Sequence, residues 1–264
     1  MDLLNLFSLK PTKIGIALSG GGIKGMCHAG VLKALEESGI KPDILSGVSS
    51  GAIVGALYAD GYTSDEIAVI FEKISIRNMT KIRIPDGGFF NSDIFHDFLS
   101  RNLRAKTFEE LSIPLRVIAT DLDNGQSVTF KSGTLIDPIV ASCTYPVLFS
   151  PKEINGVHYV DGDVLKNFPV STIRSECDII IAINASPLVV VDYKQTIINV
   201  AMRSYNFMFK ANIIHDRELC DLLIEPLENA VYDTFDNDKG REIFELGYQC
   251  ARQILATKLI TKLV

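Results

Sequence analysis

Apolar and polar residues change their period several times along the first sixty positions of the chain. Residues 14–18 (IGIAL) are a short apolar run ahead of glycines, which is typical of a buried strand. From Ile23 the apolar residues take helical spacing, and Gly39 stands where a helix can end in left-handed backbone. The run 44–48 predicts a second strand, and residues 49–59 return to helical spacing. This alternation predicts a parallel sheet with helices on its faces.

The rest of the chain continues this alternation, and its turn signals separate the elements. Further strands are predicted at residues 115–122, 126–130, 157–160, 178–184 and 222–225. Further helices are predicted at residues 64–73, 93–102, 135–143, 193–219 (in one piece or interrupted) and 239–255. Asn124-Gly125 and Asn155-Gly156 predict hairpin turns. No linker rich in Gly, Ser or Pro divides the chain, so we expect one α/β domain over residues 1–264, with its core at about 13–255.

Composition and charge narrow the class of protein. The 264 residues are 47% hydrophobic and 22% charged, as in an ordinary globular protein. A formal net charge of −6 argues against a nucleic-acid partner, whose phosphates require Lys and Arg. The five cysteines are scattered and lack zinc spacing, which fits a reducing compartment. The N-terminal stretch is short and carries Asp2 where a signal peptide is basic, so we expect a cytoplasmic protein.

Glycines follow the first predicted strand in the segment SGGGIKG (19–25). Gly20, Gly22 and Gly25 fit the dinucleotide fingerprint G-x-G-x-x-G. The same backbone N–H groups can instead hold the oxyanion of an acyl-transfer reaction. A dinucleotide site requires an acidic residue at the end of the second strand, whereas Asp43 precedes that strand. A Rossmann-type binding protein is therefore the weaker alternative.

The second predicted strand leads into GVSSG (Gly47 to Gly51), which matches the nucleophile elbow G-x-S-x-G with Ser49 at its centre. A strand before it and a helix after it are the context that an elbow requires. If the first two strands are parallel neighbours, they lie about 4.8 Å apart. The N–H groups of Gly21 and Gly22 would then face a carbonyl group attacked by Ser49.

A serine nucleophile needs a partner that takes its proton. The chain has four histidines: His28, His96, His158 and His215. His28 comes too early for the chain order of a Ser-Asp-His hydrolase, and His96 and His158 lie in a predicted helix and a predicted strand. His215 has the right order, but it also lies in a predicted helix. Asp161 follows a predicted strand directly, and Gly162 permits a tight turn beside it. A carboxylate there can act as the base if burial raises its pKa, although an Asp-Gly pair is also a common plain turn.

Together, the three motifs resemble those of the patatin-like phospholipase family, which has G-G-G-x-[RK]-G, G-x-S-x-G and D-G-[GA]. Here they read GGGIKG (20–25), GVSSG (47–51) and DGD (161–163). The segments 28–40 (HAGVLKALEESGI) and 141–151 (ASCTYPVLFSP) are also similar to the family, so the resemblance covers nearly the whole chain. It implies a single three-layer α/β domain of the patatin and lysophospholipase type, with a mainly parallel central sheet flanked by helices.

The resemblance also implies an activity. The protein would be a serine acyl hydrolase of the phospholipase A, lysophospholipase or lipid esterase type, working without a metal or other cofactor. Ser49 and Asp161 would form a catalytic Ser-Asp dyad as nucleophile and general base. The backbone amides of Gly20, Gly21 and Gly22 would form the oxyanion hole. The remaining motif residues would shape the elbow, the base loop and the glycine loop: Gly47, Gly51, Gly162 and Gly25.

Two positions need separate comment. Lys24 has the family's basic position, where it would offer a charge to a substrate phosphate or support the loop. Asp163 stands where the family has Gly or Ala, and if it lies near Asp161 its charge would raise the pKa of that base.

The implied substrate is a lipid acyl ester, and an acyltransferase that uses the same acyl-serine is a further alternative. A transient, peripheral contact with a membrane surface is also an expectation. Residues 75–91 and 202–209 offer basic and aromatic side chains for it, although they equally fit a solvated loop and a helix packed on the core. Chain length, head group and oligomeric state are left open.

Overall fold

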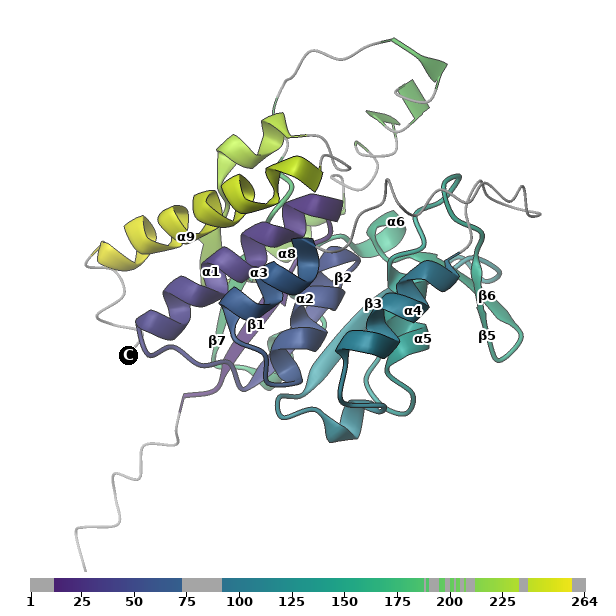
Figure 1. Ribbon diagram of the computed structural model, residues 1–264, viewed down its shortest axis with the longest axis horizontal. Coiled ribbons are helices and arrows are strands. Elements are labelled where there is room, and N and C mark those ends of the chain that lie inside the picture. Colours follow the sequence, from purple (N-terminus) through teal and green to yellow (C-terminus); the bar gives the residue numbers. More distant parts are fainter. Residues whose placement is uncertain are drawn as a thin grey trace, which may run out of the picture.

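A mixed sheet forms the centre of the computed structural model, which describes residues 12–72, 92–187, 212–232 and 237–257 and a few positions from 189 to 207 (Figure 1). Within these residues, eight strands form one sheet of order β5-β6-β3-β2-β1-β7-β8, with β4 paired to β3. The strands are β1 (Ile14–Leu18), β2 (Ile44–Val48), β3 (Leu115–Asp121), β4 (Gln126–Phe130), β5 (Lys152–Ile154), β6 (Val157–Asp161), β7 (Ile179–Ile183) and β8 (Leu222–Ile224). Neighbours from β3 to β8 along this order are parallel, whereas β4, β5 and β6 pair antiparallel.

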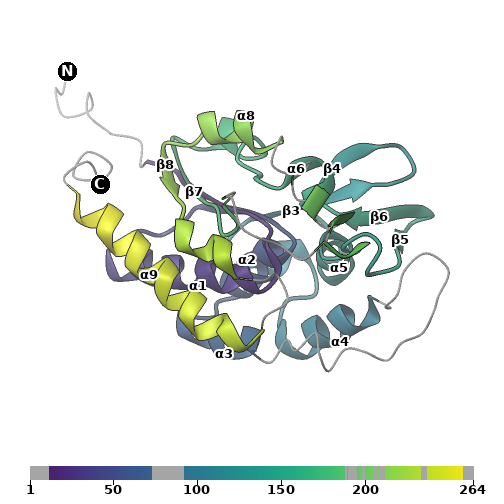
Figure 2. The ribbon, with the colours of Figure 1, turned by 90° about the horizontal axis from the view of Figure 1, so that it is seen from above.

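Helices cover the two faces of the sheet unequally. They are α1 (Met26–Glu37), α2 (Ser50–Ala59), α3 (Ser64–Glu72), α4 (Asp93–Asn102), α5 (Ile136–Ser142), α6 (Asp163–Lys166), α8 (Ile213–Glu218) and α9 (Gly240–Ala256). In Figure 2, α1, α2, α3, α4 and α9 lie on one side of the sheet and α8 on the other. Side chains alternate accordingly, since Ile16 and Leu18 join the larger core and Ala17 joins the smaller one.

Two glycines bring α1 and α9 unusually close together. A Cβ on Gly30 would lie 2.0 Å from the carbonyl oxygen of Phe244, and one on Gly247 would lie 2.4 Å from that of Cys27. No side chain separates the two backbones at these points. The last described helix is therefore packed directly on the first.

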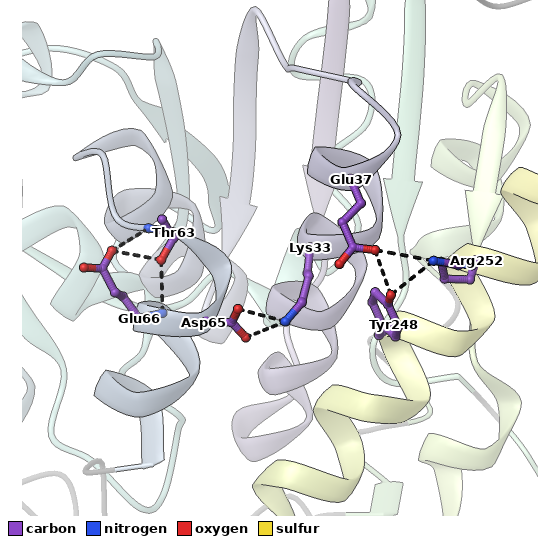
Figure 3. Close-up of polar contacts among 7 residues, drawn as sticks. All are labelled: Lys33, Glu37, Thr63, Asp65, Glu66, Tyr248 and Arg252. Atoms are coloured by element: carbon purple, nitrogen blue, oxygen red, sulfur yellow. Dashed lines mark hydrogen bonds and ion pairs between the residues drawn. The ribbon is translucent and has the colours of Figure 1, made fainter.

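Polar contacts on the outer surface support the same group of helices (Figure 3). Lys33 on α1 forms an ion pair with Asp65 on α3 at 2.8 Å. Tyr248 on α9 donates its hydroxyl to Glu37 on α1 at 2.7 Å. Exposed contacts of this kind contribute little to stability one by one, so the apolar interfaces beneath them hold the layer together.

Most predicted elements are confirmed to within two or three residues, including both hairpins. Asn155 and Gly156 have φ angles of 53° and 80°, as a two-residue turn between β5 and β6 requires. The sequence analysis did not predict β5 and α6, which are three and four residues long. Of the predicted helix 193–219, α8 (Ile213–Glu218) is described. Residues 75–91 and most of 202–209 lie outside the described residues.

Among the described helices, none is both long enough and apolar enough to cross a lipid bilayer.

Candidate active site

The register of the sheet brings three strand ends to one point. Leu18 at the end of β1 is level with Gly47 on β2. Along one side of β3, Val48 of β2 pairs with Ile118, and Asp161 of β6 pairs with the next residue, Ala119. Because β2 runs parallel and β6 antiparallel to β3, their carboxyl ends meet head to head. The residues after β1 and β2 and the last residue of β6 therefore share one rim.

Ser49 occupies a strained turn between β2 and α2. Its φ and ψ angles are 52° and −125°, a conformation that non-glycine residues rarely adopt and that marks functional sites. Its side-chain hydroxyl donates a hydrogen bond to Oδ2 of Asp161 at 2.7 Å. The residue is 8% exposed, so the pair lies largely out of water.

Close backbone packing makes glycine necessary around this turn. A Cβ on Gly47 would lie 2.5 Å from the carbonyl oxygen of Gly51, and a Cβ on Gly51 would lie 2.5 Å from that of Leu18. On Gly162 it would lie 2.4 Å from the carbonyl oxygen of Ile118. A side chain at any of these positions would push the serine and the carboxylate apart.

Asp161 is a buried carboxyl group with hydrogen bonds on both oxygens. It is 1% exposed, and its Oδ1 accepts the backbone N–H of Asp163 at 2.9 Å. Burial raises the pKa of Asp161 to about 7, while the N–H of Asp163 and the hydroxyl of Ser49 act in the opposite direction. A carboxyl group with this pKa is matched to accept a proton near neutral pH.

The backbone N–H groups of the glycine loop differ in whether they already form a hydrogen bond. The N–H of Gly20 donates to the carbonyl oxygen of Asn167 at 3.3 Å, so that amide is already engaged. Gly21 and Gly22 have φ angles of 154° and 61°, and their N–H groups have no acceptor within the described part of the chain. Of the three amides expected in the oxyanion hole, those of Gly21 and Gly22 are the ones left to bind a substrate.

A buried histidine supports this loop from behind. His28 Nε2 lies 2.8 Å from the carbonyl oxygen of Ser19, and burial lowers the pKa of His28 to about 4. The imidazole is therefore neutral and donates to that carbonyl group. The hydroxyl of Ser19 in turn accepts the N–H of Ala185 at 3.0 Å. His28 thus contributes to the structure of the glycine loop.

Lys24 and Gly25 lie in a short 3₁₀ turn, Gly22–Gly25. Lys24 is 7% exposed, so its charge is not presented to solvent. A Cβ on Gly25 would lie 2.6 Å from that of Ser50. This burial favours loop support over phosphate binding for Lys24.

Two residues that the sequence analysis did not single out hold the site. The backbone N–H of Ser49 donates to the hydroxyl of Ser142 at 2.8 Å, and that hydroxyl donates to the carbonyl oxygen of Ile118 at 2.6 Å. The N–H of Asp161 donates to the carbonyl oxygen of Thr144 at 2.9 Å. Both lie in the segment 141–151 noted above, so its family-like pattern was the available signal.

The other acidic and histidine candidates lie elsewhere. His158 is 3.1 Å from Asp123 through Nδ1, and His96 is paired with Ser100 on α4. Asp43 accepts the N–H of Ile14 at 2.7 Å, which places it at the end of β1 opposite the glycine loop. The Asp43 carboxylate is therefore too far from the glycine loop to bind the ribose of a dinucleotide held there. This removes the acidic residue that the dinucleotide alternative requires.

A mixed sheet with a buried serine in a strand-turn-helix elbow, a buried carboxylate and a glycine loop is the arrangement expected of an α/β protein of the acyl-hydrolase type. The sequence profile described as "Patatin-like phospholipase" matches residues 16–173. The chain belongs to the patatin-like phospholipase family.

Similar proteins give the same assignment. An uncharacterized NTE family protein of Mycobacterium tuberculosis is 32% identical over 176 residues, which are 65% of this chain and 49% of that protein. Patatin-like phospholipase domain-containing protein 6 of Homo sapiens is 31% identical over 61% of this chain and 12% of its own length. The chain thus spans half or less of these relatives. The crystal structure of VipD from Legionella pneumophila has a TM-score of 0.56 at 15% identity, covering 93% of this chain and 67% of VipD, which supports the fold.

Proposed function

We propose that the protein is a serine acyl hydrolase that cleaves the acyl ester of a lipid, in the manner of a phospholipase A, a lysophospholipase or a lipid esterase. The observation that carries this proposal is the 2.7 Å hydrogen bond from the strained Ser49 hydroxyl to the buried Asp161 carboxylate. Family membership supports the same class of substrate.

In the acylation step, Asp161 accepts the hydroxyl proton while Oγ of Ser49 forms a bond to the ester carbon. The electron pair of the carbonyl bond moves to its oxygen, which the N–H groups of Gly21 and Gly22 stabilise. Each such donor contributes about 3 kcal/mol to transition-state stabilisation. The ester C–O bond then breaks, and the leaving alcohol or lysolipid takes the proton from Asp161.

In the deacylation step, water attacks the acyl-serine and gives a proton to Asp161. The acyl C–Oγ bond breaks, the fatty acid leaves, and Ser49 regains its proton. One carboxyl group thus serves as base and acid in turn, which requires a pKa near the working pH.

A fluorophosphonate probe tests the nucleophile directly. We expect the purified protein to be labelled at Ser49, as located by peptide mapping, and to hydrolyse a chromogenic short-chain acyl ester. Ser49→Ala abolishes both, and Asp161→Asn lowers hydrolysis about 100-fold or more.

Ser100→Ala and Asp123→Asn are matched controls, because they remove the same groups from exposed contacts away from the site. Labelling at another residue, or full activity of Asp161→Asn, would contradict the proposal. Phospholipid, lysophospholipid and neutral ester substrates then distinguish the three kinds of hydrolase. Product analysis with added alcohol or thiol acceptors distinguishes an acyltransferase.

A further inference from the structure

Asp163 is the motif residue that the proposed mechanism leaves unused. It begins α6 two residues after the base and is 5% exposed. A Cβ on Gly20 would lie 2.0 Å from Oδ1 and 2.3 Å from Oδ2 of Asp163. The carboxyl group thus packs against the backbone of Gly20, where it fills the space that a side chain would need.

The same residue also contacts the base. Its N–H donates to Oδ1 of Asp161 at 2.9 Å. At the other end of α6, Lys166 forms a 2.9 Å ion pair with Asp216 on α8. Asp163 is therefore fixed between the glycine loop and the base loop, and the short helix that carries it is anchored.

The Asp163 carboxyl group is poorly satisfied as an anion. Its Oδ1 has no hydrogen-bond partner within the described part of the chain, and Asn167 supplies one hydrogen bond to the group. Burial, and then the charge of Asp161, raises the pKa of Asp163 well above its ordinary value. Cys143 also faces both carboxyl groups, and burial keeps it protonated by raising its own pKa. Burial and the charge of Asp161 both favour the protonated, neutral form of the carboxyl group that packs on Gly20.

We infer that Asp163 is a positioning residue of the proposed reaction: its side chain packs on Gly20 and holds the glycine loop in register with the base Asp161. The inference rests on the proposed function. It predicts that the volume of this side chain is needed and that a negative charge on it is not.

Two substitutions separate volume from charge. Asp163→Asn keeps the shape and stays neutral, and Asp163→Gly restores the residue of the D-G-[GA] pattern while removing the carboxyl group. Both keep the N–H that binds Asp161. We expect Asp163→Asn to stay within about threefold of the parent in the rate of fluorophosphonate labelling at Ser49, and Asp163→Gly to lower that rate and kcat about 10- to 100-fold. KM should change less than kcat, because the loss concerns the amides that face the oxyanion.

Gly20→Ala tests the contact independently of activity. Its three nearest contacts are all atoms of the Asp163 side chain, so we expect it to lower the temperature of thermal unfolding. Adding Asp163→Gly should restore stability, because the space is then free. Asp163→Ala replaces Asp163→Gly throughout if the glycine variant does not fold by circular dichroism.

The outcomes distinguish the inference from the function on which it rests. Equal labelling rates and kcat in the parent and Asp163→Gly overturn the inference and leave the hydrolase standing. A loss in Asp163→Asn as large as in Asp163→Gly also overturns it, because the charge would then be needed. Failure of Asp163→Gly to rescue Gly20→Ala overturns the packing on which it is built. An unlabelled parent protein overturns the proposed function, and the inference with it.

Discussion

The side-chain hydroxyl of Ser142 accepts the backbone N–H of Ser49 at 2.8 Å, although the two residues are 93 positions apart. Ser142 is the last residue of α5, and Ser49 directly precedes α2. This bond fixes a peptide whose backbone is strained. Strained conformations persist only where the surroundings over-determine them, so the bond is part of what keeps Ser49 in place.

Ser142→Ala should therefore weaken both the fold and the site. A buried N–H is left without an acceptor, which costs about 1–3 kcal/mol of unfolding free energy. Denaturant unfolding measures this loss, and the labelling rate of the folded protein measures the effect on Ser49. Ser100→Ala is the control, since its hydroxyl is exposed on α4. If Ser142→Ala keeps the stability and the labelling rate of the parent, the turn at Ser49 does not need the hydrogen bond to Ser142.

The rate of ester hydrolysis should rise with pH through a value near 7. Asp161 must be ionised to accept the proton of Ser49, and burial raises its pKa to about 7. Below that pH the base is protonated and kcat/KM falls about tenfold for each further pH unit. Measurement of kcat/KM across the pH range checks this. A profile that is already level at about pH 5 would mean that Asp161 has an ordinary carboxyl pKa.

Folding stability should change with pH in the opposite sense. The folded pKa values of Asp161 and Asp163 are raised above the ordinary value of 3.8, so the folded chain holds these protons more tightly than the unfolded chain. Their contribution is fully present below that value and is lost as the pH rises through the folded pKa. Asp163→Asn has no carboxyl group to ionise at this position, so it avoids the part of the stability loss that Asp163 causes. Its free energy of unfolding relative to the parent should therefore increase from about pH 4 upward.

Asp123→Asn is the matched control for this titration. The N–H and the side chain of His158 hold the pKa of Asp123 below its usual range. Its contribution is therefore lost as the pH falls, which is the opposite sign. Urea unfolding at a series of pH values measures both. Parallel curves for Asp163→Asn and the parent would contradict the buried-acid assignment.

The contact between α1 and α9 predicts that two glycines of one helix differ in their tolerance of alanine. Gly247→Ala places a Cβ 2.4 Å from the carbonyl oxygen of Cys27, so it should destabilise the protein by about 1–3 kcal/mol. A Cβ at Gly240 meets nothing nearer than 3.6 Å, so Gly240→Ala should leave stability unchanged or raise it by up to about 1 kcal/mol. Thermal unfolding compares the pair. Equal effects would mean that the helices can separate without cost.

The sequence predicted which candidate residues lie together better than it predicted the contacts that hold them. Ser49 and Asp161 each follow a strand within a short motif, so local pattern was enough to propose them. The contact of Ser142 with Ser49 depends on how α5 packs against the elbow, and no local pattern encodes such a distance. The hydrogen bond from the Gly20 N–H to Asn167 is accepted by a backbone carbonyl group. Every residue type has such a group, so no sequence pattern predicts this contact.

Asp163 shows a second limit. The sequence analysis expected its charge to raise the pKa of Asp161. In the structure the two carboxyl groups are buried neighbours, burial is the largest cause that raises both pKa values, and the N–H of Asp163 lowers the pKa of Asp161. The sequence therefore identified the neighbouring carboxyl group, but the burial of each group and the direction of its hydrogen bonds come from the fold.

The packing of α9 on α1 also bears on how this chain is made. During synthesis, α1 leaves the ribosome more than two hundred residues before Gly247 is available to cover it. Until then its apolar flank stays open to water and to other nascent chains, because a contact so distant in sequence cannot form early. Chaperone demand during translation should accordingly persist until the final described helix has emerged.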